Sequence, residues 1–153
     1  MNELSHKHLI TLTLAVDFPN TVVIGDTPAG SRRIAPVAGG SFSGERLNGI
    51  VHPGTDWALI RPDGVLVIDV RLTLETDDGA KLYLRYEGRF VAAPDAMARF
   101  SKGHLLDPSD YSLVVTAKFE CGDPRYQWLN NVIAAGTGEQ TPAGPLYSFF
   151  QIG

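Results

Sequence analysis

The sequence predicts an all-β fold, most simply a closed antiparallel β-barrel. Apolar residues recur at every second position over long stretches, as in half-buried strands. The 16 glycines and 10 prolines divide the 153 residues into many short segments, and helical periodicity is scarce. A barrel is favoured over an open sheet because closure removes the exposed strand edges that promote aggregation.

The first predicted strand covers 10–16, where leucine, isoleucine and valine alternate with threonine and alanine. The clearest strand covers 65–75, with one wholly apolar face. It lies between 61–64 and 76–79, whose aspartates and glycines favour tight turns. The middle of the chain therefore reads as a meander of three strands, and its outer members lie at about 55–60 and 80–90.

The rest of the chain predicts further strands at 111–119, 132–136 and 146–152, the last two pairing across a turn-rich loop at 137–145. Helix is expected only at 94–100 and in a short turn opened by Asp123 and Pro124. The glycine-rich segment 38–44 lacks the Gly-Lys-Ser/Thr ending of a phosphate loop, and no helix follows it. It predicts a bulge or a tight corner at a barrel rim.

Composition predicts one domain spanning 1–153 and excludes several classes of function. The net charge is −4 and only Arg32 and Arg33 are adjacent cations, which argues against binding to nucleic acid. Cys121 is the single cysteine, so neither an intrachain disulfide nor a cysteine-based metal cluster is expected. The apolar run at 9–16 is too short and too alternating for a signal peptide or a membrane span, so a cytoplasmic protein is expected.

The second face of the 65–75 strand is polar, with Asp69, Arg71, Thr73 and Glu75 in succession. One interpretation is a solvated outer face over a packed apolar one. In the other, one end of this face turns into a pocket, where Arg71 pairs with the carboxylates because an isolated buried charge is too costly. Tyr83 on the next strand would join this cluster across the hairpin.

A loop histidine and three aromatic residues are further pocket candidates. His52 precedes a Pro-Gly pair close to Asp56 and Trp57, as loop residues of binding sites do. Trp57, Tyr126 and Trp128 fit either the core or a wall on which a ligand stacks. His6 and His8 share a strand face at a spacing that can bind metal, but their terminal position favours coincidence, so no metal is predicted.

Motifs along nearly the whole chain resemble those of the domain of unknown function 3237, a family of small bacterial and fungal proteins. They lie at 29–33, 36–44, 47–49, 53–57, 61–64, 69–79, 119–120, 122–126 and 128–130. The resemblance implies a compact barrel similar to the calycin or streptavidin type, usually a homo-oligomer, and no settled activity. As pocket candidates it implies Arg33, Asp56, Trp57, Asp69, Arg71, Tyr126, Trp128, Leu129 and Asn130.

These observations predict a cofactor-independent enzyme acting on a hydrophobic small molecule that carries a carbonyl or a phenol. The chemistry would be that of a lyase, dehydratase, isomerase or cyclase, because a closed apolar cavity with few polar groups suits acid–base catalysis. Arg71, with Arg33, would stabilise an oxyanion. The base would be Asp56, Asp69 or Glu75, and the proton donor Tyr83 or Tyr126.

Two alternatives remain open at this point: a non-catalytic carrier of the lipocalin type, and a module that serves only in assembly. Self-association as a homodimer or larger oligomer is predicted from the C-terminal strand, which is apolar on both faces. Leu146, Phe150 and Ile152 point one way, and Tyr147 and Phe149 point the other.

Overall fold

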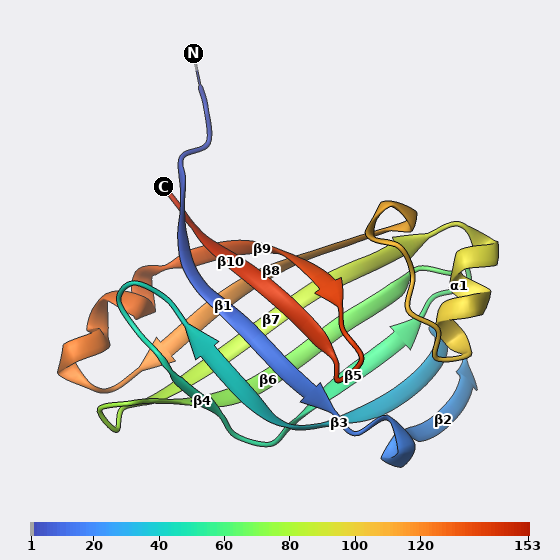
Figure 1. The fold of residues 1–153 in the computed structure, drawn as a ribbon, viewed down its shortest axis with the longest axis horizontal. Coiled ribbons are helices and arrows are strands. Elements are labelled where there is room, and N and C mark those ends of the chain that lie inside the picture. Colours follow the sequence, from blue (N-terminus) through green and yellow to red (C-terminus); the bar gives the residue numbers. More distant parts are fainter. Residues whose placement is uncertain (1) are drawn as a thin grey trace.

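Ten strands of the computed structural model, which describes residues 2–153, form one antiparallel sheet rolled into a barrel (Figure 1). The strands are β1 (His6–Val16), β2 (Val22–Thr27), β3 (Gly30–Ser43), β4 (Gly49–Val51), β5 (Gly54–Ile60), β6 (Leu66–Thr76), β7 (Lys81–Ala92), β8 (Tyr111–Cys121), β9 (Ile133–Gln140) and β10 (Pro145–Ile152). One α-helix, α1 (Pro94–Ser101), and the 3₁₀ segments η1 (Phe18–Asn20), η2 (Pro108–Asp110) and η3 (Pro124–Asn131) complete the described elements. The predicted closed antiparallel barrel is confirmed.

Pairing between β1 and β3 closes the ring, whose order is otherwise β1-β10-β9-β8-β7-β6-β4-β3. Both β4 and β5 pair with β3 on one side and β6 on the other, so together they fill one position. The ring formed by the described residues therefore has eight positions. The short β2 pairs with β3 and extends the sheet beyond the ring.

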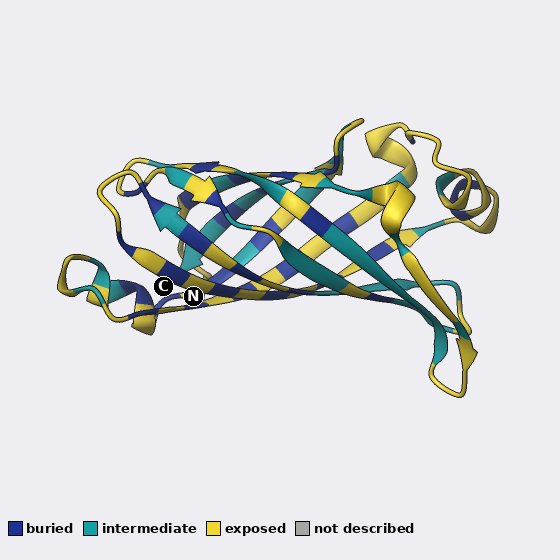
Figure 2. Ribbon diagram, turned by 90° about the horizontal axis from the view of Figure 1, so that it is seen from below, coloured by how far each residue is buried: buried dark blue, intermediate teal, exposed yellow. Residues whose placement is uncertain are grey.

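Alternation along each strand decides which residues face the interior, and it is visible as bands of buried and exposed residues in Figure 2. In β6 the residues Ile68, Val70, Leu72 and Leu74 are buried, while Arg71 and Thr73 between them are exposed. Neighbouring strands keep this register, so their apolar faces meet inside the ring.

The seam between β1 and β3 depends on close backbone approach. Gly40 lies opposite Leu14, and a Cβ at position 40 would overlap the carbonyl oxygen of Thr13. The pairing shifts between Ala15 and Val16, which places a bulge at Ala38. The glycine-rich segment thus contains the predicted bulge, but as part of a long strand and not as a corner at the rim.

The two ends of the barrel differ in packing. At the end near η3 and β4 the interior is filled by fully buried leucines, among them Leu47, Leu82 and Leu129. At the opposite end, where α1 and β2 lie, the interior is hollow. Phe100 of α1 stacks on Phe90 with ring centroids 4.5 Å apart, which holds the helix beside this opening. No helix among the described residues is long and apolar enough to cross a membrane.

The predicted strand at 10–16 lies within β1, and the strand predicted at 65–75 recurs as β6 shifted by one residue. The other predicted strands and the helix recur with bounds that differ by a few residues, whereas β2, β3 and β4 were not predicted. β9 continues to Gln140, into a segment predicted as a loop, because β8 and β10 pair with it on both sides. In β10, Tyr147 and Phe149 face the core, and the outward residues Leu146, Phe150 and Ile152 remain half-buried. Self-association through this face stays a prediction.

Candidate functional site

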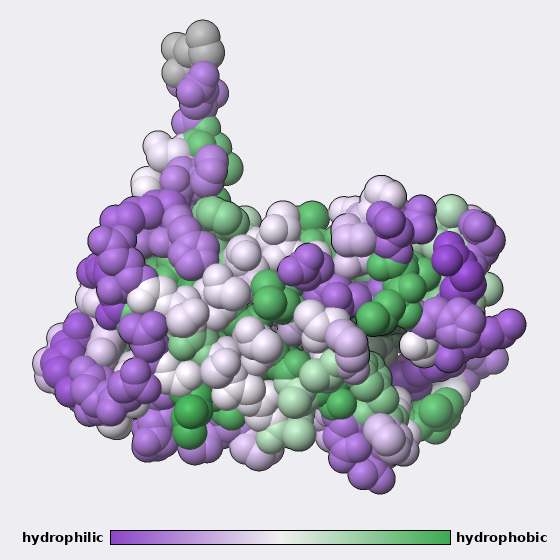
Figure 3. All heavy atoms as spheres, viewed as in Figure 1, coloured by the Kyte–Doolittle hydropathy of each residue, from purple (hydrophilic) through white to green (hydrophobic). Residues whose placement is uncertain are grey.

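A cavity of about 770 Å³ occupies the hollow end of the barrel. This is within the size range of small-molecule sites, about 300–1,000 Å³. Its wall comes from inward residues of the strands, and its rim from α1, β2 and the turn between β9 and β10. In the view of Figure 3, the end near η3 is mostly hydrophilic, while apolar side chains reach the surface on the side of α1. The rim includes the exposed side chains of Phe18, Val23 and Leu105.

The hollow arises because small residues occupy inward positions at this end. Ala35 of β3 and Ala58 of β5 line the cavity where the other end of the barrel carries leucine and phenylalanine. On β9, a Cβ at Gly138 would lie 2.7 Å from Cδ1 of Tyr147, so the absent side chain leaves room for this ring. The neighbouring rings of Tyr147 and Phe149 are buried against each other below the cavity.

Asp56 projects from β5 into the cavity beside a local opening of the sheet. Pairing of β5 with β6 includes Asp56–Val70 and resumes at Leu59–Val67, with residues 57–58 and 68–69 left unpaired between them. The N–H of Asp69 donates to Oδ1 of Asp56 at 3.2 Å, in place of a ladder bond. The carbonyl oxygen of Trp57 accepts from Nη1 of Arg32 at 2.7 Å. One carboxylate oxygen is thereby fixed, and two of the backbone groups at the opening, the Asp69 N–H and the Trp57 carbonyl, have side-chain partners.

Burial raises the pKa of the Asp56 carboxyl to about 7, and the carboxylate of Asp69 adds to the rise. The hydrogen bond from the Asp69 N–H opposes it. Although part of the Asp56 surface is solvent-accessible, that surface faces the cavity, where apolar walls replace bulk water. Near neutral pH this carboxyl is therefore present in both protonation states, as an acid–base catalyst requires.

Tyr86 and Tyr147 also line the cavity, with their rings in edge-on contact at 5.1 Å between centroids. Desolvation raises the pKa of both phenols, and the nearby Asp56 carboxylate raises both further. A hydrogen bond between the two side chains raises the pKa of Tyr86 and lowers that of Tyr147, because Tyr86 donates and Tyr147 accepts. Both tyrosines therefore remain protonated, and Tyr147 has the hydroxyl proton that is free to bind a ligand oxygen. The cavity thus combines apolar walls with three proton-bearing groups.

Arg33 lies on the inward face of β3 and lines the same cavity. In the register of β3 and β5 it faces Ala58, and its neighbour Ala35 faces Asp56. Arg33 and Asp56 are therefore diagonal neighbours, whose Cβ atoms lie roughly 7–8 Å apart in such sheets. The Nε of Arg33 is buried and has no hydrogen-bond partner within residues 2–153.

The predicted cluster around Arg71 is not formed. Arg71 is exposed on the outer face of β6, opposite the exposed Arg85 of β7, and neither lines the cavity. Tyr83 and Glu75 share this outer face. Asp69 alternates with the same face of β6 but is half-buried, and its Oδ1 is shielded and has no hydrogen-bond partner within residues 2–153, while its N–H reaches Asp56. Strand alternation places the polar face outside because the apolar face fills the core, which was the first of the two interpretations.

Two further candidates belong to the outer surface. His52 bonds Glu75 at 2.9 Å, and Lys81 pairs with the same carboxylate at 2.8 Å. The hydrogen bond from Lys81, followed by that from His52, holds the pKa of Glu75 below its usual value. Trp57 points outward and is 46% exposed. Neither His52 nor Trp57 lines the cavity.

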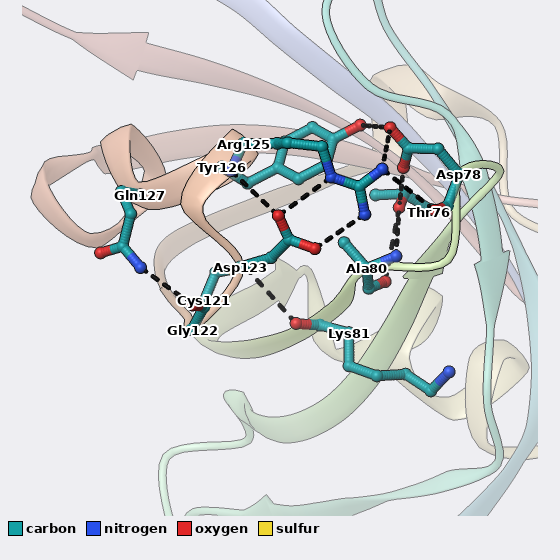
Figure 4. A network of polar contacts seen from close by, with 10 residues as sticks. All are labelled: Thr76, Asp78, Ala80, Lys81, Cys121, Gly122, Asp123, Arg125, Tyr126 and Gln127. Carbon is teal, nitrogen blue, oxygen red and sulfur yellow. Dashed lines mark hydrogen bonds and ion pairs between the residues drawn. The ribbon is translucent and has the colours of Figure 1, made fainter.

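Tyr126, Trp128 and Asn130 lie at the packed end, away from the cavity. Figure 4 shows η3 held to the β6–β7 turn by Arg125, which pairs with Asp123 at 2.7 Å and with Asp78 at 3.1 Å. Hydrogen bonds from Arg125 lower the pKa of Asp123 to about 2. The hydroxyl of Tyr126 donates to Asp78 at 2.8 Å. These residues therefore close the end of the barrel opposite the cavity.

Trp128 and Asn130, which follow Tyr126 in η3, also pack against the closed end of the barrel. The guanidinium of Arg46 lies 3.4 Å from the ring centre of Trp128, a cation–π contact. Asn130 accepts from the N–H of Cys121 at 2.8 Å and donates to its carbonyl oxygen at 2.8 Å. The side chain of Asn130 thus continues the ladder at the end of β8.

Replacing Asn130 with alanine is expected to lower the free energy of unfolding by about 1–2 kcal/mol, because both backbone groups of Cys121 lose their partner. Chemical denaturation measures this, with the exposed neighbour Asn131→Ala as the matched control. Ligand binding in the cavity should be unchanged. A loss of binding without a loss of stability would place Asn130 in the ligand site instead.

Of the site residues predicted from sequence, Arg33 and Asp56 line the cavity, and Tyr86 and Tyr147 were missed. A signal for both tyrosines is present in the sequence. Each lies on the apolar face of its strand, and a buried tyrosine hydroxyl needs a polar environment. Within residues 2–153, no three His, Cys, Asp or Glu side chains come together as metal ligands.

The chain is similar to one protein family, and to individual relatives and solved structures. The model of the family described as protein of unknown function (DUF3237) matches residues 4–152. A UPF0311 protein of Clostridium acetobutylicum is 30% identical, over 99% of this chain and 96% of its own. The crystal structure of a conserved protein of unknown function from Rhodopseudomonas palustris has a TM-score of 0.93 at 28% identity, covering 99% of both chains. The crystal structure of an enzyme from Penicillium herquei has a TM-score of 0.74 at 21% identity, covering 100% of this chain and 97% of its own, which shows a shared fold.

Proposed function

The chain belongs to the DUF3237 family, and we propose that it is an enzyme that moves a proton on a hydrophobic small molecule bearing a carbonyl or a phenol. The observation that carries this proposal is Asp56, a carboxyl with a pKa of about 7 inside an apolar cavity. A carboxyl at the surface would be ionised at neutral pH and a poor proton donor. Burial here supplies the value that acid–base catalysis favours.

The geometry supports the following roles for the residues that line the cavity. The ionised carboxylate of Asp56 takes a proton from the carbon next to the ligand carbonyl, the electron pair of that C–H bond forms a C=C bond, and the π pair of the carbonyl moves to its oxygen. Arg33 and a tyrosine hydroxyl stabilise the resulting oxyanion. Asp56 then returns the proton to another carbon or to a leaving group. Isomerisation, elimination and cyclisation share this first step.

Two further observations support catalysis over simple carriage. A carrier has no need of a carboxyl whose burial destabilises its charged form, because apolar walls alone retain an apolar ligand. In addition, the similarly folded protein of Penicillium herquei is an enzyme, so this fold is compatible with catalysis.

Proton exchange tests the proposal without knowledge of the natural substrate. The bicyclic ketone 2-tetralone is incubated with the protein in D₂O, and proton NMR follows deuterium incorporation beside the carbonyl, with the rate in buffer subtracted. Exchange should be faster with protein and should rise with pH through about 7 as Asp56 ionises. Glu87→Gln, on the exposed outer face, should leave the rate unchanged.

A carrier gives a different result. Calorimetry would then show that 2-tetralone binds, while deuterium incorporation stays at the rate in buffer. That outcome would overturn the enzymatic proposal.

A further inference from the structure

The charged side chains that line the cavity, Arg33 and Asp56, indicate which kind of ligand it binds. Within residues 2–153, Arg33 makes neither an ion pair nor a side-chain hydrogen bond, and its Nε is shielded from solvent. Arg33 as a whole is half-buried, and its Nη atoms are not among the shielded atoms, so they stay open to the cavity that the residue lines. Its positive charge therefore has no counter-charge within residues 2–153 and is available to a ligand.

Asp56 does not supply that counter-charge. Among the described residues it is the single acidic side chain lining the cavity, and one of its oxygens is engaged by the Asp69 N–H. It forms no ion pair with Arg33, although the two are diagonal neighbours across β3 and β5. Because burial keeps much of the Asp56 population protonated near neutral pH, the cavity carries excess positive charge.

The rest of the cavity surface is apolar or uncharged. Ile68 and Phe90 face the Arg33 side from β6 and β7, and the rim adds Phe18, Val23 and Leu105. A ligand that fits this surface has an apolar, ring-sized body and one anionic group. The anionic oxygen would lie between Arg33 and Asp56, within reach of the tyrosine hydroxyls below.

We propose that the cavity selects a hydrophobic monoanion, with a carboxylate, phenolate or enolate oxygen bound by Arg33. The inference rests on the proposed function only in taking this cavity as the functional site, and it does not require turnover. It narrows the ligand class from carbonyl- or phenol-bearing molecules in general to those that bind in ionised form. It also assigns Arg33, rather than any outer-face arginine, as the residue that sets this selectivity.

Two ligands that differ chiefly in charge test the inference by calorimetry. 2-Naphthoate carries a carboxylate on a naphthalene ring, and 2-acetonaphthone carries a neutral methyl ketone at the same position. The wild-type protein should bind 2-naphthoate about 10- to 100-fold more tightly, the expected contribution of a hydrogen bond to a charged partner. Arg33→Met should abolish this preference, because it should weaken binding of 2-naphthoate far more than binding of the neutral 2-acetonaphthone.

Two further variants distinguish the loss of the Arg33 charge from the loss of its side-chain packing. Arg71→Met removes an exposed outer arginine and should leave both affinities at their wild-type values. Arg33→Lys keeps the charge and should retain part of the preference, because lysine lacks the planar fork of guanidinium. Arg33→Met should unfold at a temperature close to that of the wild type, because Arg33 makes no ion pair and no side-chain hydrogen bond within residues 2–153.

The pH dependence is a further readout. Asp69, Arg33, Tyr86 and Tyr147 are the titratable groups that surround Asp56 from β6, β3, β7 and β10. The affinity of the wild type for 2-naphthoate should fall above pH 7, as the Asp56 carboxylate begins to repel the bound anion. Asp56→Asn should remove this fall.

Equal affinity of the wild-type protein for both ligands would overturn the inference, and so would a preference that survives in Arg33→Met. Neither result bears on catalysis, because 2-naphthoate has no proton beside its carboxylate to exchange. Conversely, absence of exchange with 2-tetralone together with an Arg33-dependent preference for 2-naphthoate would refute the proposed enzyme and retain the anion site.

Discussion

Replacing Asp56 with asparagine is expected to reduce the catalysed deuterium exchange of 2-tetralone about a hundred- to ten-thousand-fold, the usual contribution of a general acid–base group. Asparagine has the same shape and keeps the oxygen that accepts from the Asp69 N–H, so the local opening of the sheet is preserved. What it loses is the ability to take up a proton. NMR measures the rate, and binding of 2-tetralone to the variant shows that the cavity is intact.

The same variant is expected to gain stability as it loses activity. The pKa of Asp56 is raised from 3.8 to about 7 in the folded protein, so the folded state binds the proton more tightly than the unfolded state. The free energy of unfolding of the wild type therefore falls as pH rises between these two values. The full cost above pH 7 is up to about 4 kcal/mol, less whatever water in the cavity screens.

Urea denaturation at pH 4 and at pH 8 separates this effect from others. At pH 4 the wild-type carboxyl is largely protonated in the folded state, and the two proteins should have similar stability. At pH 8 the asparagine variant should be the more stable by a few kcal/mol. Asp123→Asn is a suitable control, because the pKa of Asp123 is lowered to about 2, so its stabilising contribution is only slightly larger at pH 8 than at pH 4, which is opposite in sign to the change expected for Asp56.

A stability difference that does not change with pH would mean that Asp56 titrates normally and would remove the basis of the proposed function. A variant that is more stable and also inactive would instead show that the buried carboxyl is retained for chemistry at the expense of the fold. The two measurements are independent, since denaturation requires no substrate.

Structural features that depend on local sequence are predicted, whereas features that depend on long-range strand pairing are not. The strands from β5 onward are predicted because their side chains alternate and their turns contain Asp and Gly. β3 was not, because Pro36 and the paired glycines Gly39 and Gly40 weaken its local pattern. It is a strand because β1, β4 and β5 pair with it, and such long-range pairing leaves no periodic signal.

The candidate site shows the same limit. Sequence motifs drew attention to Arg71 and Trp128, which lie on the outer face and at the closed end, because a motif does not reveal which face or end of a barrel its residues occupy. Asp56 and Arg33 were identified, but their shared cavity follows from the antiparallel register of β3 with β5. Tyr86 and Tyr147 lie on strands far apart in the sequence and meet only through closure of the ring.

Closure itself should be sensitive to one methyl group. Gly40→Ala is expected to lower the free energy of unfolding by about 3 kcal/mol or more, the upper part of the range for overpacking. The added Cβ would overlap the carbonyl oxygen of Thr13, with Leu14 Cα at 3.1 Å, and both are backbone atoms held by the β1–β3 pairing. No side-chain rotation can relieve this contact.

The consequences of Gly40→Ala should extend to the cavity, because the seam positions its wall. Leu14 and Val16 line the cavity from β1, and Arg33 lines it from β3. The variant should therefore unfold at lower urea concentration and bind 2-naphthoate more weakly. Gly122→Ala is the matched control, since a Cβ at this position meets no atom within 4 Å. Equal stability of the two variants would show that β1 and β3 are held together less tightly than their register indicates.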